Sequence, residues 1–247
     1  MSKIFWCTKC VVASTRPRVS FNKDGVCTAC QWAEEKKKID WKSRTLKLDT
    51  LLSAQDKDKP FQCVTAVSGG KDGSYITYNL KHKKKVSTLS VTSRPPLEQK
   101  LGRQNLNNFV NSGYPHIHVT PDVEAMRKLD KLGFTELGHP YYGWLISIHT
   151  AVVRVASEFN IPLIFYSEDG DVEYGGDAKH KNEGIYGIEY QKSNYLEGDY
   201  EKILKMAKLT KEQAYWFTFP SDEEIKKKNI KITHWSFYED WDPYRNY

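Results

Sequence analysis

A glycine-rich loop between a predicted strand and a predicted helix limits the fold of this chain more than any other feature. Residues 61–67 are a β-prone run, residues 68–74 read Ser-Gly-Gly-Lys-Asp-Gly-Ser, and residues 75–81 have the apolar spacing of a helix. Glycines let backbone amides approach an anion closely, and a helix N-terminus adds a favourable dipole. The loop lacks the spacing of a Walker motif. It therefore predicts a phosphate site of another kind, whose contacts are Ser68, Gly69, Gly70, Lys71, Asp72, Gly73 and Ser74.

Strands and helices are predicted to alternate through most of the remaining chain. This order predicts an α/β fold with a doubly wound parallel sheet, in which ligands lie at the carboxyl ends of the strands. Three more predicted strands cover residues 86–91, 116–119 and 161–166, and three predicted helices cover residues 98–110, 122–132 and 144–159.

The last of these strands runs into an acidic segment, Ser-Glu-Asp-Gly-Asp-Val-Glu-Tyr-Gly-Gly at residues 167–176. Four carboxylates within six residues are costly unless they meet water, a metal ion or cations, and their spacing is not that of an EF-hand. Two interpretations stay open: a solvated acidic turn, or a site for Mg²⁺ or substrate beside the phosphates. The candidate residues of that site are Glu168, Asp169, Glu173, Tyr174 and Gly175.

Four further candidates lie elsewhere in the predicted domain. Thr92 follows the second strand and would face the same crevice, and Arg103 lies on the helix after it. In the aromatic cluster at residues 141–144, Tyr142 and Trp144 could stack on a ligand ring or pack in the core.

Four cysteines organise the N-terminus. They form two C-x-x-C pairs separated by residues 11–26, and residues 22–25 read as a hairpin turn before the second pair. Two such pairs can close a tetrahedral sulfur site, with Zn²⁺ as the first candidate and an iron–sulfur cluster as an alternative that the spacing does not support. Four cysteines around one ion leave no open position for catalysis. We therefore expect a zinc ribbon held by Cys7, Cys10, Cys27 and Cys30.

The same segment sets the expected domain division. Residues 32–42 read as a charged helix and residues 56–60 as a linker turn, so we predict a ribbon with its linking helix at 1–45 and the main domain at 46–247. A segment as short as the ribbon cannot form a core of its own, so the metal would replace one.

The composition and net charge limit the kinds of partner that this chain is expected to bind. The chain has 247 residues and a formal charge of +6; four zinc-bound thiolates and one Zn²⁺ would lower this to about +4. Such a modest excess suits a nucleotide phosphate better than nucleic acid. No apolar window is long enough for a membrane span, and the first residues do not resemble a signal peptide, so a cytoplasmic protein with no membrane partner is expected.

The loop at residues 68–74 resembles the SGG-x-D-S signature of the ATP pyrophosphatases, also called the PP-loop superfamily, except that its second hydroxyl comes one place later, at Ser74. Within that superfamily, the chain is similar to the bacterial N-acetyl sugar amidotransferases. The motifs that carry this similarity are the two cysteine pairs, Asp-Gly-Val-Cys at 24–27, the loop itself, and residues 101–106, 138–144 and 161–176.

The resemblance implies ATP, Mg²⁺ and a nucleotide-activated sugar as ligands of the phosphate loop and the acidic strand end. ATP would adenylate the oxygen of an acetamido group, and ammonia would then displace AMP to give an acetamidino group, in the biosynthesis of O-antigen and related surface polysaccharides. The resemblance also implies that ammonia comes from a separate glutaminase with a synthase-like subunit, similar to the pair that forms imidazole glycerol phosphate synthase.

Family members run on well beyond residue 247. The aromatic tail from Tyr215 is therefore expected to pack onto a C-terminal segment or a partner subunit outside this chain.

Two alternatives remain open. A tRNA-modifying thiolase would also join cysteine pairs to an SGG-K-D-S loop, but many thiolases carry sulfur on cysteines after the loop, and this chain has none beyond Cys63. A non-catalytic zinc-ribbon binding module is the second alternative, and it leaves the phosphate loop unexplained.

Overall fold

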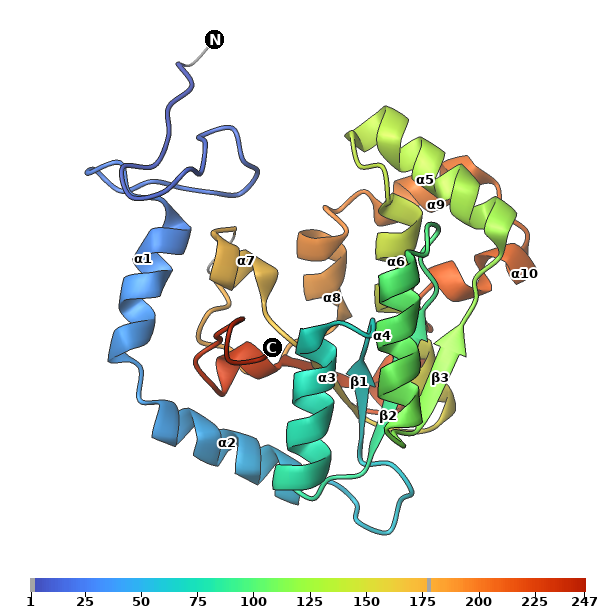
Figure 1. Ribbon diagram of the computed structural model, residues 1–247. Coiled ribbons are helices and arrows are strands. Elements are labelled where there is room, and N and C mark those ends of the chain that lie inside the picture. The colour runs from blue at the N-terminus through green and yellow to red at the C-terminus, as the bar shows by residue number, and fades with distance from the viewer. Residues whose placement is uncertain (1–2, 177–178) are drawn as a thin grey trace.

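The computed structural model contains one five-stranded parallel sheet and describes residues 3–176 and 179–247 (Figure 1). The strand order is β3-β2-β1-β4-β5, so the order reverses between β1 and β4. The predicted α/β fold with a parallel sheet is confirmed. The strands are β1 (Cys63–Ala66), β2 (Thr88–Ser93), β3 (His116–Val119), β4 (Leu163–Tyr166) and β5 (Lys231–His234).

Helices connect the strands and cover both faces of the sheet (Figure 1). The α-helices are α1 (Thr28–Glu35), α2 (Trp41–Ser53), α3 (Lys71–Tyr78), α4 (Lys100–Asn111), α5 (Val123–Leu137), α6 (Tyr142–Glu158), α7 (Gly170–Tyr174), α8 (Ile188–Tyr190), α9 (Tyr200–Ala207), α10 (Lys211–Ala214) and α11 (Asp222–Lys227). Shorter 3₁₀ and π turns are η1 (Lys36–Lys38), η2 (Asn79–Lys83), η3 (Gln191–Tyr195), η4 (Tyr215–Phe217) and η5 (Trp235–Phe237).

Successive side chains of a strand point to opposite faces of the sheet, and they pack into two separate hydrophobic cores. In β4, Ile164 joins the large cluster formed with α5, α6 and α9, whereas Leu163 and Phe165 join the cluster formed with α2 and α3. A strand that is buried on both faces reads as a continuous apolar run, and the sequence of β4 has that form. The two cores fix the sheet, so the ends of its strands are held in a constant arrangement.

The predicted helix over residues 32–42 is wrong in its bounds. Two helices cover this region, because Asp40 accepts a hydrogen bond from the amide of Ser43 (3.0 Å) and so caps the start of α2. Helix α2 then runs through residue 45, where the domain division was predicted. The N-terminal arm, which we define as residues 3–53, packs onto the rest of the chain. Within it, Arg44 donates to the carbonyl of Phe237 (3.1 Å).

The aromatic tail packs onto this chain itself, contrary to the expectation from its sequence. Strand β5 pairs with β4, and Trp235, Tyr238 and Trp241 are buried in the core with α2 and α3. Tyr247 at the end of the tail is exposed. Among the described residues, no helix has the length and apolar character needed to cross a bilayer.

Candidate functional site

The phosphate loop connects β1 to α3 in a conformation that only glycine permits. Gly69 has φ +83°, and a Cβ there would lie 2.6 Å from the amide nitrogen of Leu106. Gly73 lies against the end of β1, where a Cβ would come within 2.7 Å of the carbonyl oxygen of Ala66. Gly70 precedes the first turn of α3 and has no side chain to cap it, so that the turn is accessible to a ligand.

A hollow of about 260 Å³ opens beside this loop, where the strand order reverses. In doubly wound sheets this is the position at which ligands bind. One wall is largely apolar and is formed by Val91, Trp144, Ile148, Val152 and Tyr166; the polar side is formed by Ser68, Gly70, Asp72, Gly73, Ser93, Ser167 and Glu168. An apolar wall opposite convergent polar groups suits a ligand with a flat ring and charged groups.

Two carboxylates meet at the polar side of this hollow. Asp72 pairs with Lys71 through Oδ2 (2.5 Å), but its Oδ1 is buried and has no hydrogen-bond partner among the described residues. Burial raises the pKa of Glu168, and the charge of Asp72 raises it further, against a lowering by Lys71. Two carboxylates that disfavour each other's charge are a suitable pair of ligands for a hard divalent cation such as Mg²⁺.

Tyr174 lies within electrostatic reach of the same pair. Its pKa is raised to about 12, mainly by burial and then by the negative charge of Glu168, with a further contribution from Asp72. Tyr174 is nevertheless not among the described residues that line the hollow, and 42% of its surface is exposed.

The other face of the loop borders a second, more open hollow of about 520 Å³. Gly69, Lys71 and Ser74 lie on this side, together with Lys83 and Arg245. The hydroxyl of Ser74 donates to the carbonyl of Gly70 (2.8 Å), as a residue inside a helix does. The seven predicted loop residues are thus divided between two faces, with Asp72 on one side and Lys71 on the other.

Asp169 does not face the hollow, in contrast to the prediction. Its carboxylate caps α7 by accepting from the amides of Asp171 and Val172, and it also accepts from the hydroxyls of Tyr190 (2.8 Å) and Tyr195 (3.2 Å). Burial raises the pKa of Asp169, but His234 and these donors outweigh it, and the net pKa is lowered. Both oxygens of Asp169 therefore already accept hydrogen bonds from this chain, and the residue is not among the described residues that line the hollow.

Glu173 and Gly175 were also predicted as ligand residues, and both contact the N-terminal arm instead. Glu173 accepts from the indole of Trp32 (3.0 Å) and from Lys36 (2.9 Å). Gly175 has φ +87°, and its carbonyl accepts from the hydroxyl of Thr28 (3.1 Å). The acidic segment is therefore mainly a docking surface for distant cations and donors, which neither interpretation of its sequence anticipated.

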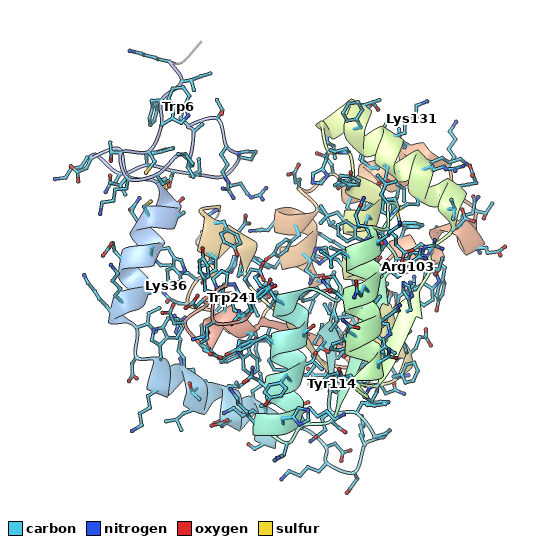
Figure 2. The ribbon with its side chains drawn as sticks, in the orientation of Figure 1. Trp6, Lys36, Arg103, Tyr114, Lys131 and Trp241 are labelled. Carbon is cyan, nitrogen blue, oxygen red and sulfur yellow. The ribbon has the colours of Figure 1, made fainter. Side chains whose placement is uncertain are left out.

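Thr92 and Arg103 lie outside the hollow. The hydroxyl of Thr92 donates to the carbonyl of Val67, so it supports the loop from below, and its neighbour Ser93 lines the hollow. Side chains alternate along a strand, which is why only one of the two can face this side. Arg103 is paired with Glu98, and Figure 2 shows it on the side of α4 away from Lys36.

Tyr142 is a core residue rather than a stacking platform. It is fully buried, its hydroxyl donates to the carbonyl of Leu196 (2.6 Å), and Gly133 makes room for it, since a Cβ at Gly133 would lie 2.2 Å from that of Tyr142. Trp144 two residues later does line the hollow and donates to the carbonyl of Ser93 (3.3 Å).

Most residues of the apolar wall were not singled out from the sequence, and two of them lie on α6. Ile148 and Val152 follow Trp144 at intervals of four residues, so all three lie on one stripe of α6. That spacing was a usable signal, but the same pattern is found wherever a helix faces a core.

The four N-terminal cysteines converge, as their spacing predicts. Their sulfur atoms all lie within 4.8 Å of one another, with Cys7 to Cys30 at 4.0 Å and Cys10 to Cys27 at 3.6 Å. A tetrahedral ion with metal–sulfur bonds of about 2.3 Å holds its sulfur atoms about 3.8 Å apart, so the site fits a single Zn²⁺-like ion.

Backbone amides support the same site. Cys7 accepts from the amides of Cys27 (3.2 Å) and Lys9 (3.3 Å). Burial raises the pKa of Cys7, but the amide donors outweigh it and lower the pKa to about 6. Thiolates are the form that binds metal, and amides directed at a sulfur stabilise that form.

The similarity of this chain to known proteins is weak. No protein-family model and no curated protein matches the chain. Among solved structures, an NMN synthetase from Francisella tularensis is 16% identical, with a TM-score of 0.40; the match covers 53% of this chain and 56% of that one. This chain therefore matches little more than half the length of that enzyme.

Two further structures are similar at the same level. The U34-tRNA thiolase NcsA from Methanococcus maripaludis, solved with its 4Fe–4S cluster, is 17% identical, with a TM-score of 0.38, and the match covers 90% of this chain and 71% of that one. An NH3-dependent NAD synthetase from Campylobacter jejuni, in complex with nitrate, is 14% identical, with a TM-score of 0.35 over 77% and 93%. All three TM-scores are below 0.5, so the site is interpreted from the geometry of this chain alone.

Proposed function

We propose that the chain is an ATP pyrophosphatase of the PP-loop type, which cleaves ATP to AMP and pyrophosphate while it adenylates a carbonyl oxygen. The observation that carries this proposal is the unpartnered, buried Oδ1 of Asp72, which shares the polar side of the hollow with Glu168 and the glycine loop. A buried carboxylate oxygen without a partner is costly, and a bound cation would satisfy it.

The residues around the hollow would contact different parts of MgATP, according to where they lie. The apolar wall that contains Trp144 and Ile148 would accept the adenine ring, and the amides of the loop at Gly70 would hold the phosphates. Asp72 and Glu168 would hold Mg²⁺, which supplies positive charge to the phosphates when bound. Lys71 forms an ion pair with the Asp72 carboxylate and is the cationic side chain of the loop.

For the acceptor, we propose the acetamido group of a nucleotide-activated sugar. Its oxygen would attack the α-phosphorus of ATP as pyrophosphate leaves, and ammonia would then add to the activated carbon as AMP leaves, giving an acetamidino group. Three cations, Lys71, Lys83 and Arg245, line the open hollow on the other face of the loop, and two of them are also paired, Lys71 with Asp72 and Arg245 with Glu239. This cationic lining supports an anionic acceptor. Ammonia would come from a separate glutaminase with its synthase-like subunit.

No protein nucleophile is required in this scheme. Cys63, which is the cysteine outside the N-terminal cluster, is fully buried within β1, and burial raises the pKa of its thiol. It cannot relay sulfur from that position, which argues against a thiolase that uses a cysteine of the main domain.

The test is pyrophosphate release from ATP, measured with ammonium and UDP-linked diacetamido sugars in one series and with bulk tRNA in another. We expect release that depends on the sugar and is lost in Asp72→Asn and in Glu168→Gln. The control is Glu98→Gln, which removes a carboxylate on the exposed pair with Arg103. Release that depends only on tRNA would reject the sugar acceptor, and no release under any condition, with no binding of ATP, would reject the PP-loop assignment.

A further inference from the structure

Helix α7 lies between the proposed magnesium ligand and the cysteine-bearing N-terminal arm. Glu168 and Asp169 directly precede it, and the carboxylate of Asp169 caps its first turn. Figure 1 shows α7 next to α1, the helix that follows the cysteine site. A helix of five residues cannot hold its place by its own hydrogen bonds, so its contacts determine where it lies.

The first of these contacts is an ion pair at Asp171. Arg18 donates to Oδ1 through Nη2 (3.1 Å) and Nε (3.3 Å), and Asn194 donates to Oδ2 (2.8 Å). Arg18 belongs to the segment between the two cysteine pairs, so this contact joins the cysteine module, defined as residues 3–30, to the middle of α7.

The second contact is at Glu173, whose side chain is only 5% exposed. It accepts from Trp32 on α1 and from Lys36 immediately after α1. Lys36 also donates to the carbonyl of Trp241 (3.2 Å), and the two residues lie side by side in Figure 2. Both oxygens of Glu173 are thus held by the arm.

The third contact leads directly to the cysteine site. Gly175 packs on Ala29, where a Cβ would lie 2.9 Å from the Ala29 side chain, and it accepts from Thr28. Thr28 and Ala29 are the two residues between Cys27 and Cys30. The turn that brings these two sulfur atoms together is therefore the same turn on which the end of α7 rests.

We infer that Asp171 and Glu173 are positioning residues, which make the placement of Glu168 in the hollow depend on the folded, metal-holding cysteine module. The inference rests on the proposed function for the role of Glu168 as a magnesium ligand. The part of the inference that does not depend on that role is that α7 shifts or becomes mobile when the cysteine module loses its metal.

The first test compares Glu173→Gln with Asp240→Asn. Both carboxylates pair with Lys36, at 2.9 Å and 3.2 Å, but the Asp240 side chain is exposed and belongs to the C-terminal tail, not to α7. We expect Glu173→Gln to raise the Mg²⁺ concentration for half-maximal pyrophosphate release severalfold, with the KM for ATP at saturating Mg²⁺ unchanged. Asp240→Asn should behave as the unmodified chain. Equal behaviour of the two variants in an active, folded protein would overturn the inference and leave the proposed function intact.

The second test does not need activity. The metal is removed with a thiol-compatible chelator, and amide hydrogen exchange is followed in the full chain. We expect faster exchange in the peptide over residues 168–175 and unchanged exchange in α5. Unchanged exchange in residues 168–175 would overturn the inference even if the chain releases no pyrophosphate.

The Arg18 side of the contact gives a third comparison, which applies if Glu173→Gln does not fold. Arg18→Gln should raise the half-maximal Mg²⁺ concentration, and Arg18→Lys should restore it in large part, because lysine keeps the charge that faces Asp171. Failure of Arg18→Lys to differ from Arg18→Gln would contradict a role for this ion pair.

Discussion

Replacement of Asp72 by asparagine is predicted to stabilise the ligand-free chain while it abolishes the response to MgATP. A buried carboxylate oxygen without a partner costs about 1–3 kcal/mol, whereas a partly exposed ion pair such as that of Asp72 with Lys71 contributes only about 0.2–1 kcal/mol. Asparagine keeps a polar atom at that buried position but is neutral, so it lowers the cost of burial from that of a charged group to that of a neutral one, and it removes the charge that opposes Glu168. The net gain should be about 1 kcal/mol, or about 2–4 °C in Tm for a chain of this length.

Thermal unfolding with and without MgATP checks both halves of this prediction. In the unmodified chain, ligand at a hundredfold excess over Kd should add about 2.7 kcal/mol of stability. In Asp72→Asn that increment should vanish, and Lys71→Met serves as the control that removes the ion pair but keeps the carboxylate. A lower Tm for Asp72→Asn than for the unmodified chain, or an undiminished shift with MgATP, would refute the reasoning.

The pH dependence of the gain has a definite sign. The pKa of Glu168 is raised in the folded chain by burial and by Asp72, so the destabilisation from its ionisation is complete above the folded pKa and disappears as the pH falls to the ordinary pKa of a glutamate. The advantage of Asp72→Asn should therefore be present at neutral pH and shrink as the pH falls through the pKa of Glu168. An advantage that grows on acidification would contradict the assignment of these two groups as a repelling pair.

Three further substitutions test other parts of the structure. Gly69→Ala forces a side chain into φ +83° and against the backbone of Leu106, so pyrophosphate release should be lost and Tm should fall by several degrees. Tyr142→Phe leaves the carbonyl of Leu196 without its donor, which should cost about 1–2 kcal/mol of unfolding free energy in a denaturant titration while the KM for ATP stays unchanged. Arg103→Ala on the exposed face of α4 should change the unfolding free energy by less than about 0.5 kcal/mol and leave pyrophosphate release unchanged. A loss of pyrophosphate release in this variant would show that Arg103 contributes to the site after all.

Most elements of the fold could be predicted from local patterns. The strand at residues 116–119 has the same bounds in the structure as in the sequence analysis, and the loop between β1 and α3 lies where its glycines indicate. The predicted ends of helices were less accurate where a single capping side chain determines them, as Asp40 does at the start of α2. Those caps depend on one hydrogen bond, which periodicity does not report.

The site was predicted only in part, and the acidic segment shows why. Of its carboxylates, Glu168 faces the hollow, whereas Asp169 and Glu173 are held by donors from other elements. Residue type and spacing indicated a charged site, but they could not tell which oxygens already have partners inside the protein. The same limit applies to Tyr142, whose burial depends on the packing of α5 against α6.

The sequence by itself determined the alternation of strands and helices, the glycine-rich loop between β1 and α3 and the convergence of four cysteines, because each of these follows from residues close together in the chain. Tertiary structure alone decided what the acidic strand end contacts, because Arg18, Trp32 and Lys36 reach it from 137 to 153 residues away. It also decided that the aromatic tail completes the core of this chain. Contacts of that range are set by how the elements pack, since no local preference encodes the distance between two segments so far apart.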